Sequence, residues 1–258
     1  MDIGHLSGGL VLLGSLAFFL AGTVKGVLGL GLPTVSIGLL GLMISPTQAA
    51  SLIILPALAT NIWQFCGGDA RAEILRRLLT MMLAMVVGVW FGVKLMLGAH
   101  QALVGMALGL LLIVYAVFGL RASLPKTGTE AETFLSPLAG VVTGGLAGAT
   151  GIMVMPGLAY LQSLGFERRQ LIQALGLMFT VGSVSLGGLL WIYSEHWVSL
   201  NSEAWIGVSV TGTVAAMLGM RLGRRIEPKL SGPLFRRLFS VWLVINGLVI
   251  ITRNQTLF

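Results

Sequence analysis

Eight strongly apolar segments fill this 258-residue chain, and most have the length that one helix needs to cross a lipid bilayer. They lie at 8–44, 48–66, 78–97, 102–120, 134–164, 171–193, 204–222 and 238–252. Charged residues make up only 10% of the chain, against about a quarter in soluble domains. Because the apolar runs are continuous and do not alternate with polar residues, they predict helices and not the strands of a β-barrel. The expected fold is an all-α integral membrane protein.

The first and fifth segments are too long for one crossing and too short for two. Each contains helix-breaking residues, in "GVLGLGLPTVS" and in "GGLAGATGIMVMPG". Gly costs about 1 kcal/mol and Pro about 3 kcal/mol in a helix interior, so an unbroken helix is disfavoured in both. We expect two broken helices that fold back as re-entrant hairpins.

These two segments also resemble each other. A shift of 118 residues aligns "AGTVKGVL" at 21–28 with "AGVVTGGL" at 139–146, and places Thr143 opposite Lys25. The sequence therefore predicts two repeats of four helical segments, each made of one hairpin and three spans. The expected first transmembrane repeat is 1–122, the cytoplasmic linker 123–133 and the second transmembrane repeat 134–258.

The placement of basic residues tests this topology. If each hairpin returns to its starting side and the chain starts outside, the loops 67–77, 121–133, 165–170 and 223–237 are cytoplasmic. These loops and the helix ends beside them carry thirteen Lys and Arg residues, while the opposite side keeps Lys94 and Arg253. Cytoplasmic loops are enriched in Lys and Arg, so the hairpin topology is favoured. In this topology the second repeat is inverted relative to the first, and both termini lie on the periplasmic side of a bacterial inner membrane. The basic loops also account for the net charge of +7, so we expect no nucleic-acid binding.

Lys25 stands deep in the first hairpin, and no Asp or Glu lies deep in any segment. A charged side chain at the centre of a helix in the bilayer costs about 2.5–3.5 kcal/mol on insertion scales. Two interpretations remain open: the ammonium extends to the interface or caps the broken helix, or it forms part of an anion site.

The glycines and hydroxyl residues at the breaks favour an anion site. The first turn of a helix has unpaired N–H groups and a partial positive charge, and Gly lets an anion approach them closely. Polar residues on the following spans face the same region in the proposed arrangement, with Thr180 as a weaker candidate. The candidate substrate-binding residues are Lys25, Gly29, Gly31, Thr34, Asn61, Gln64, Thr143, Gly148, Thr150, Gly151, Gln173 and Ser183.

Other classes of function fit less well. His5, His100 and His196 lie near loops or segment ends, with no HExxH or CxxC motif, so we expect no enzyme, no metal and no cofactor. Inverted repeats with broken helices are a recurring transporter architecture. A passive anion channel, a proton-coupled permease for another anionic metabolite and a non-transporting membrane assembly partner remain as alternatives.

The segments "GVLGLGLPTVSIGLLGL…SPTQAASL" and "GGLAGATGIMVMPGLAYLQSLGFERRQLIQAL" resemble those of the TauE/SafE family of sulfite and sulfonate exporters. The likeness covers nearly the whole chain. It implies export of small sulfur-containing anions, such as sulfite or organosulfonates, across the bacterial inner membrane. It also implies a homodimer in the lipid bilayer, with a small anion as the partner in transport.

Overall fold

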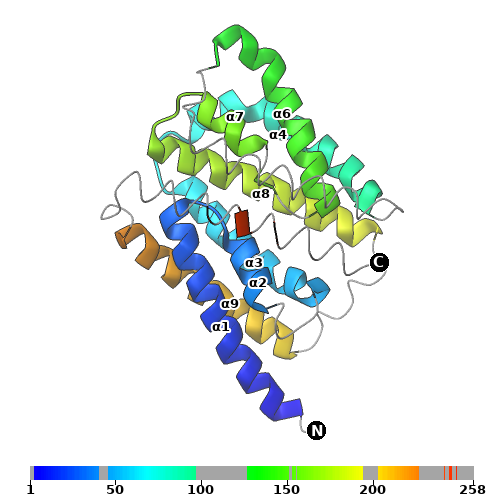
Figure 1. Cartoon of the computed structure of the whole chain (residues 1–258), viewed down its shortest axis with the longest axis vertical. Coiled ribbons are helices and arrows are strands. Elements are labelled where there is room, and N and C mark those ends of the chain that lie inside the picture. The colour runs from blue at the N-terminus through cyan, green and yellow to red at the C-terminus, as the bar shows by residue number, and fades with distance from the viewer. Residues whose placement is uncertain are drawn as a thin grey trace. The chain divides into compact units, whose positions relative to one another are not determined.

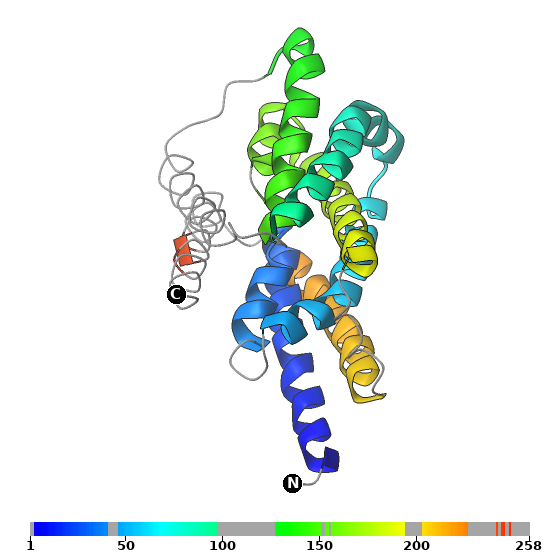
Figure 2. The same cartoon turned by 90° about the vertical axis from the view of Figure 1, so that its right-hand side faces the viewer.

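The structure is a computed structural model that describes residues 3–40, 46–96, 127–150, 153–154, 156–193, 203–226 and four single positions near the C-terminus, 241, 244, 245 and 248. The described segments are helical over most of their length (Figures 1 and 2). The expected span 102–120, most of the expected span 238–252 and the first half of the linker lie outside the described residues.

The first long segment is broken where the sequence predicts. Helix α1 (Ile3–Leu28) ends before Gly29, and α2 (Leu32–Leu40) begins after Gly31. Gly29 and Gly31 have φ angles of 77° and 104°, a region that residues with a Cβ rarely adopt. A Cβ added at Gly14, halfway along α1, would lie 3.9 Å from Leu40 Cδ2 at the end of α2. Helix α2 therefore folds back along α1 (Figure 1).

The fifth segment is broken in the same manner. Helix α6 (Thr129–Thr150) is followed by α7 (Gly157–Ser163), with residues 153–154 in non-helical conformation between them. The backbone N–H of Thr127, just before α6, donates to the carbonyl of Ser163 at 2.8 Å. The end of α7 thus lies beside the start of α6, which confirms the predicted return of this segment to its starting end.

Helices also occupy the four expected spans that the structure describes. They are α3 (Pro46–Cys66), α4 (Arg71–Met96), α8 (Arg168–Tyr193) and α9 (Glu203–Ile226). Within the described part of the chain, three helical stretches are long and apolar enough to cross a membrane: Val11–Leu28, Arg71–Leu95 and Arg168–Tyr193. Helix α3 contributes a shorter apolar stretch, Leu52–Cys66.

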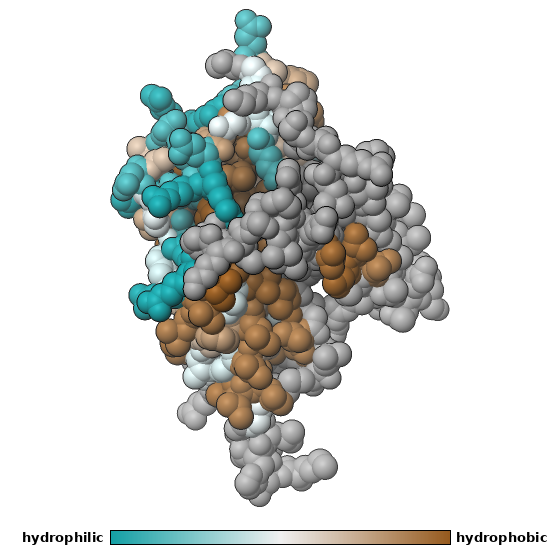
Figure 3. Space-filling model, turned by 60° about the vertical axis from the view of Figure 1, so that its left-hand side comes forward, coloured by the Kyte–Doolittle hydropathy of each residue, from teal (hydrophilic) through white to brown (hydrophobic). Residues whose placement is uncertain are grey.

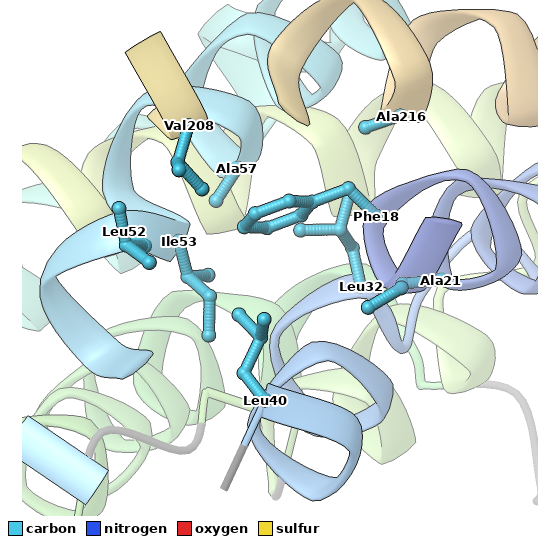
Figure 4. Close-up of a cluster of buried hydrophobic side chains, with 10 residues drawn as sticks. Phe18, Ala21, Leu32, Leu40, Leu52, Ile53, Ala57, Val208 and Ala216 are labelled. Carbon is cyan, nitrogen blue, oxygen red and sulfur yellow. The ribbon is translucent and has the colours of Figure 1, made fainter. Parts of the chain in front are cut away.

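The chain divides into two compact units that interleave in sequence. Unit 1 comprises Met1–Gln64 and Trp191–Leu230, and unit 2 comprises Phe65–Leu190 and Ser231–Phe258. The core of unit 1 joins α1, α2, α3 and α9 around the ring of Phe18, which packs among Leu40, Ile53 and Val208 (Figure 4). Unit 2 contains α4, α6, α7 and α8.

The helices expose apolar side chains and bury polar ones. In α1, Leu12, Leu16 and Leu20 are 72%, 53% and 46% exposed, while Lys25 of the same helix and Asn61 of α3 (Pro46–Cys66) are nearly completely buried. Figure 3 shows a broad apolar patch on one face of the molecule. A helix that is apolar on its outer face cannot be stable in water, and lipid is the surrounding that satisfies it.

Each unit is built on one closely packed helix pair, α1 with α9 in unit 1 and α4 with α6 in unit 2. A Cβ at Gly22 would overlap the carbonyl oxygen of Ala216, and a Cβ at Gly144 would overlap that of Met85. Small residues let helix backbones approach closely in membranes, where there is no hydrophobic drive to bring helices together.

Candidate functional site

The Lys25 ammonium lies in the last turn of α1, immediately before the break, and the side chain is 2% exposed. Its Nζ donates to Thr60 Oγ1 at 3.0 Å and to Asn61 Oδ1. These contacts use two of the three N–H donors of the ammonium, and both acceptors are neutral. The described contacts therefore solvate the charge but leave it uncompensated.

Helix α3 supplies the polar face that receives Lys25. Thr60 and Asn61 are four and three positions before Gln64, and residues at these spacings are neighbours on a helix surface, so the three side chains form one polar face. The Thr60 hydroxyl donates its proton to the Pro56 carbonyl at 2.7 Å, which leaves its lone pairs toward Lys25. Gln64 Nε2 donates to the Gly29 carbonyl at 2.8 Å and so holds the broken end of α1.

The return helix α2 follows the break directly. Its first turn begins at Leu32, directly after Gly31, and contains Pro33, which is tolerated there because the first turn has no partner for its N–H. The Ser36 hydroxyl on α2 is fully buried and has no hydrogen-bond partner among the described residues. The backbone of Thr34 lies in α2, while its side chain is outside the described structure.

The described residues of unit 1 carry more positive than negative charge. Among its described residues the single acid is Glu203, at the start of α9, whereas Arg221, Arg224 and Arg225 lie near the end of that helix. At about 1.5 Å per residue, Glu203 is about 27 Å along the helix from Arg221. The charges of Lys25 and Arg224 interact repulsively. An excess of positive charge around the buried Lys25 favours a bound anion.

The candidates on the second hairpin and on the following helix α8 lie in unit 2, and each of them makes different contacts. The buried Thr143 hydroxyl has no described partner and lies against Gly157. Gln173 Nε2 donates to the Phe65 carbonyl at 2.9 Å and so caps the end of α3, and Ser183 contacts Met153 Sδ at 4.0 Å. Thr180 donates to the carbonyl of Gly176 in its own helix.

The glycine candidates of the second hairpin fall into two groups. Gly148 lies inside α6, where a Cβ would be 2.8 Å from the Val93 backbone nitrogen of α4. This geometry favours close helix packing as the reason for that glycine, and not the approach of an anion that the sequence had suggested. Gly151 and the Thr150 side chain lie outside the described residues.

The glycine contacts of the two units match residue by residue, with a register that differs from the sequence alignment. Adding 122 to positions of α1 gives positions of α6, and subtracting 131 from positions of α9 gives positions of α4. The contact pairs Gly22–Ala216, Gly26–Met220, Phe19–Gly219 and Thr23–Gly223 then coincide with Gly144–Met85, Gly148–Val89, Val141–Gly88 and Gly145–Gly92.

This contact register differs by four residues from the shift of 118 in the sequence alignment. Glycines spaced four apart along one helix face match equally well after a slip of one helical turn. In the contact register the position of Lys25 corresponds to Ala147, whereas the sequence alignment places Thr143 there. The starts of α3 and α8, Pro46 and Arg168, are also separated by 122 residues, as are Asn61 and Ser183.

Five of the twelve candidates thus come together in unit 1: Lys25, Gly29, Gly31, Asn61 and Gln64. Thr60 is a contact that sequence reasoning missed. Its signal was its position next to Asn61, one turn before Gln64, in the otherwise apolar stretch "LIILPALATNIWQ".

Apolar outward surfaces, interrupted helices and a buried charge at one interruption define a helical membrane protein of the transporter type. The sequence model of the Sulfite exporter TauE/SafE family matches residues 14–250, and the chain belongs to this family. It is a family of membrane transporters and not of enzymes. Comparisons with curated proteins and with solved structures gave no match.

Proposed function

We propose that this protein exports small sulfur-containing anions, such as sulfite or organosulfonates, across the bacterial inner membrane by alternating access. The observation that carries the proposal is the fully buried Lys25 ammonium, which has only neutral described partners and lies at a helix break. The family supports an anion as the solute. An inside-negative potential drives an anion outward by about 2.3 kcal/mol per charge per 100 mV.

In this proposal Lys25 supplies the charge that attracts the anion, and the amides at the start of α2 supply hydrogen bonds. Gly29 and Gly31 keep side chains away from those amides, and the Ser36 hydroxyl adds a donor. Thr60 and Asn61 hold the ammonium when the site is empty and release one contact when an anion arrives. Gln64 donates to the Gly29 carbonyl and so stabilises the conformation of the break between α1 and α2.

We also propose that the chain is a duplicated unit with the second copy inverted. The matched glycine contacts support the duplication, and the bias of basic residues supports the inversion. Because Ala147 replaces Lys25 in the second copy, the two hairpins have different roles, with the charge carried by the first. Both termini lie on the periplasmic side, and two copies form the homodimer that the resemblance implies.

The direct test is anion flux in proteoliposomes, with sulfite, sulfoacetate, taurine and chloride as solutes. Lys25→Met removes the charge but keeps the length of the side chain. We expect it to lower flux of the transported anion at least tenfold, equivalent to about 1.4 kcal/mol. Lys94→Met is the matched control, because Lys94 is exposed near a helix end and packs on Trp90 at 3.6 Å. Its flux should stay within about twofold of the unsubstituted protein.

Equal flux through the Lys25→Met variant and the unsubstituted protein would refute the role of Lys25. The same assay separates a transporter from a passive channel. Flux by alternating access saturates as the solute concentration rises, whereas current through an open channel keeps increasing over the same range.

A further inference from the structure

Two arginines of α9 share one tryptophan ring of α3. The guanidinium carbons of Arg221 and Arg224 lie 5.0 and 5.1 Å from the centroid of the Trp63 ring. Residues three apart lie on the same helix face, so both guanidinium groups project from one side of α9. Each lies within the range of a cation–π contact, and together they form what we call the arginine pair.

The arginine pair has no described acidic partner. Glu203, the one described acid of unit 1, lies at the opposite end of α9. Arg224 is partly buried, and Lys25 adds a third positive charge within electrostatic reach. Both guanidinium groups lie about 5 Å from the same ring centroid, and the tryptophan quadrupole attracts each cation without supplying a negative charge. An oxyanion bound beside the ring would supply that charge and could accept hydrogen bonds from both groups.

The arginine pair adjoins the Lys25 site but does not belong to it. A Cβ on Gly26, the residue after Lys25, would lie 3.0 Å from the Arg224 backbone nitrogen. Trp63 lies between Asn61 and Gln64 in sequence but makes contacts with α9, whereas those two residues make contacts with the break of α1. Helix α3 thus carries a buried polar face toward Lys25 and an aromatic platform toward the arginines.

We propose that Arg221, Arg224 and Trp63 form a second oxyanion site beside the Lys25 site. Guanidinium groups present planar, paired N–H donors that match the oxygens of sulfonate, sulfate, phosphate and carboxylate groups. The occupant is either the anion to be transported, which would be captured there before it reaches Lys25, or the phosphate of an anionic lipid. The first source rests on the proposed function, and the binding itself does not.

The test measures binding to the full-length protein in neutral detergent by calorimetry, with sulfoacetate and inorganic phosphate as probes. It is run in the unsubstituted protein and in the Lys25→Met variant, so that the Lys25 site is absent from one of the two backgrounds. In both backgrounds we expect Arg221→Gln with Arg224→Gln to weaken binding of at least one probe tenfold or more. Arg225→Gln, on the same turn, should change it less than about twofold.

Two further measurements protect the result against a folding artefact. The Arg221→Lys, Arg224→Lys variant keeps both charges but loses the planar donors, and should bind with intermediate affinity. Binding should also quench or enhance tryptophan fluorescence in the unsubstituted protein, and Trp63→Phe should abolish that signal. Unchanged affinity of the double Gln variant in both backgrounds, or an unchanged fluorescence signal in Trp63→Phe, would overturn the proposal.

The source of the oxyanion is decided in nanodiscs. If lipid phosphate occupies the site, phosphatidylglycerol should compete with the soluble probes, and phosphatidylcholine alone should not. The double Gln variant would then lose the retained phosphatidylglycerol seen by native mass spectrometry. If the solute occupies it, probe affinity is the same in both lipids and anion flux falls in the double variant. A further outcome is that the double Gln variant loses probe binding in an assay where the unsubstituted protein transports none of the tested anions. That result would support this oxyanion site and refute the proposed exporter function.

Discussion

Lys25 combines two properties at the scale of the single residue, complete burial and neutral acceptors. Thr60 and Asn61 orient the ammonium without neutralising it, since a hydroxyl and an amide oxygen carry only partial charges. A carboxylate in their place would form an internal ion pair and leave less attraction for an incoming anion. The neutrality of these two residues is therefore as important to the proposed site as the charge of Lys25.

This argument predicts the behaviour of Asn61→Asp. We expect the new carboxylate to pair with Lys25, to retain the fold, and to lower anion flux at least tenfold in proteoliposomes. Asn61→Thr keeps a neutral acceptor and should lose less than about threefold. Flux at the level of the unsubstituted protein in Asn61→Asp would show that Lys25 attracts no anion.

At the scale of the element, glycine serves two different purposes. Gly29 and Gly31 are required for positive φ angles at the break, whereas Gly22, Gly26, Gly144 and Gly148 are required for helix contact. The sequence predicted the breaks correctly because Gly and Pro combine within a segment of unsuitable length. It did not separate the two purposes, since the partner helix of each glycine lies far away in the chain.

The packing purpose leads to a stability prediction. A Cβ at Gly144 would overlap the Met85 carbonyl, a rigid backbone atom, so Gly144→Ala forces α4 and α6 apart. We expect a loss of about 1–3 kcal/mol, typical of overpacking in a close-packed interior. It should appear as a lower thermal unfolding midpoint in detergent. Gly188→Ala on α8 is the control, because nothing lies within 4 Å of its added Cβ. Equal midpoints for the two variants would contradict the close approach.

At the scale of the whole molecule, the compact units do not follow the order of the chain. Unit 1 joins the first hairpin and α3 with α9, while unit 2 joins the second hairpin and α8 with α4. The third segment of each proposed repeat thus packs on the hairpin of the other. The proposed repeats and the compact units therefore have different boundaries.

The proposed topology can be tested with the single cysteine, Cys66, which is exposed at the end of α3. The basic stretch 67–77 follows it; the sequence predicted a loop there, but α4 already begins at Arg71. Because Lys and Arg gather on the cytoplasmic side of a membrane, we expect this stretch to be cytoplasmic. A membrane-impermeant maleimide should label Cys66 in spheroplasts only after permeabilisation.

A second cysteine position provides the control. In a Cys66→Ser background, Thr256→Cys in the C-terminal tail should be labelled in intact spheroplasts, since the tail is expected on the periplasmic side. The reverse labelling pattern would invert the topology, and labelling of both positions from the same side would refute it.

The sequence by itself determined the helical membrane fold and the two broken segments and singled out Lys25, because segment length, glycine, proline and isolated charge are local properties. Only the tertiary structure decided which residues of α1 and α6 make matching contacts, since a four-residue slip preserves every glycine match. It also decided the partners of Lys25 and the pairing of Arg221 and Arg224 on Trp63. Those contacts join residues that are distant in the chain, and no local pattern specifies which helix faces which.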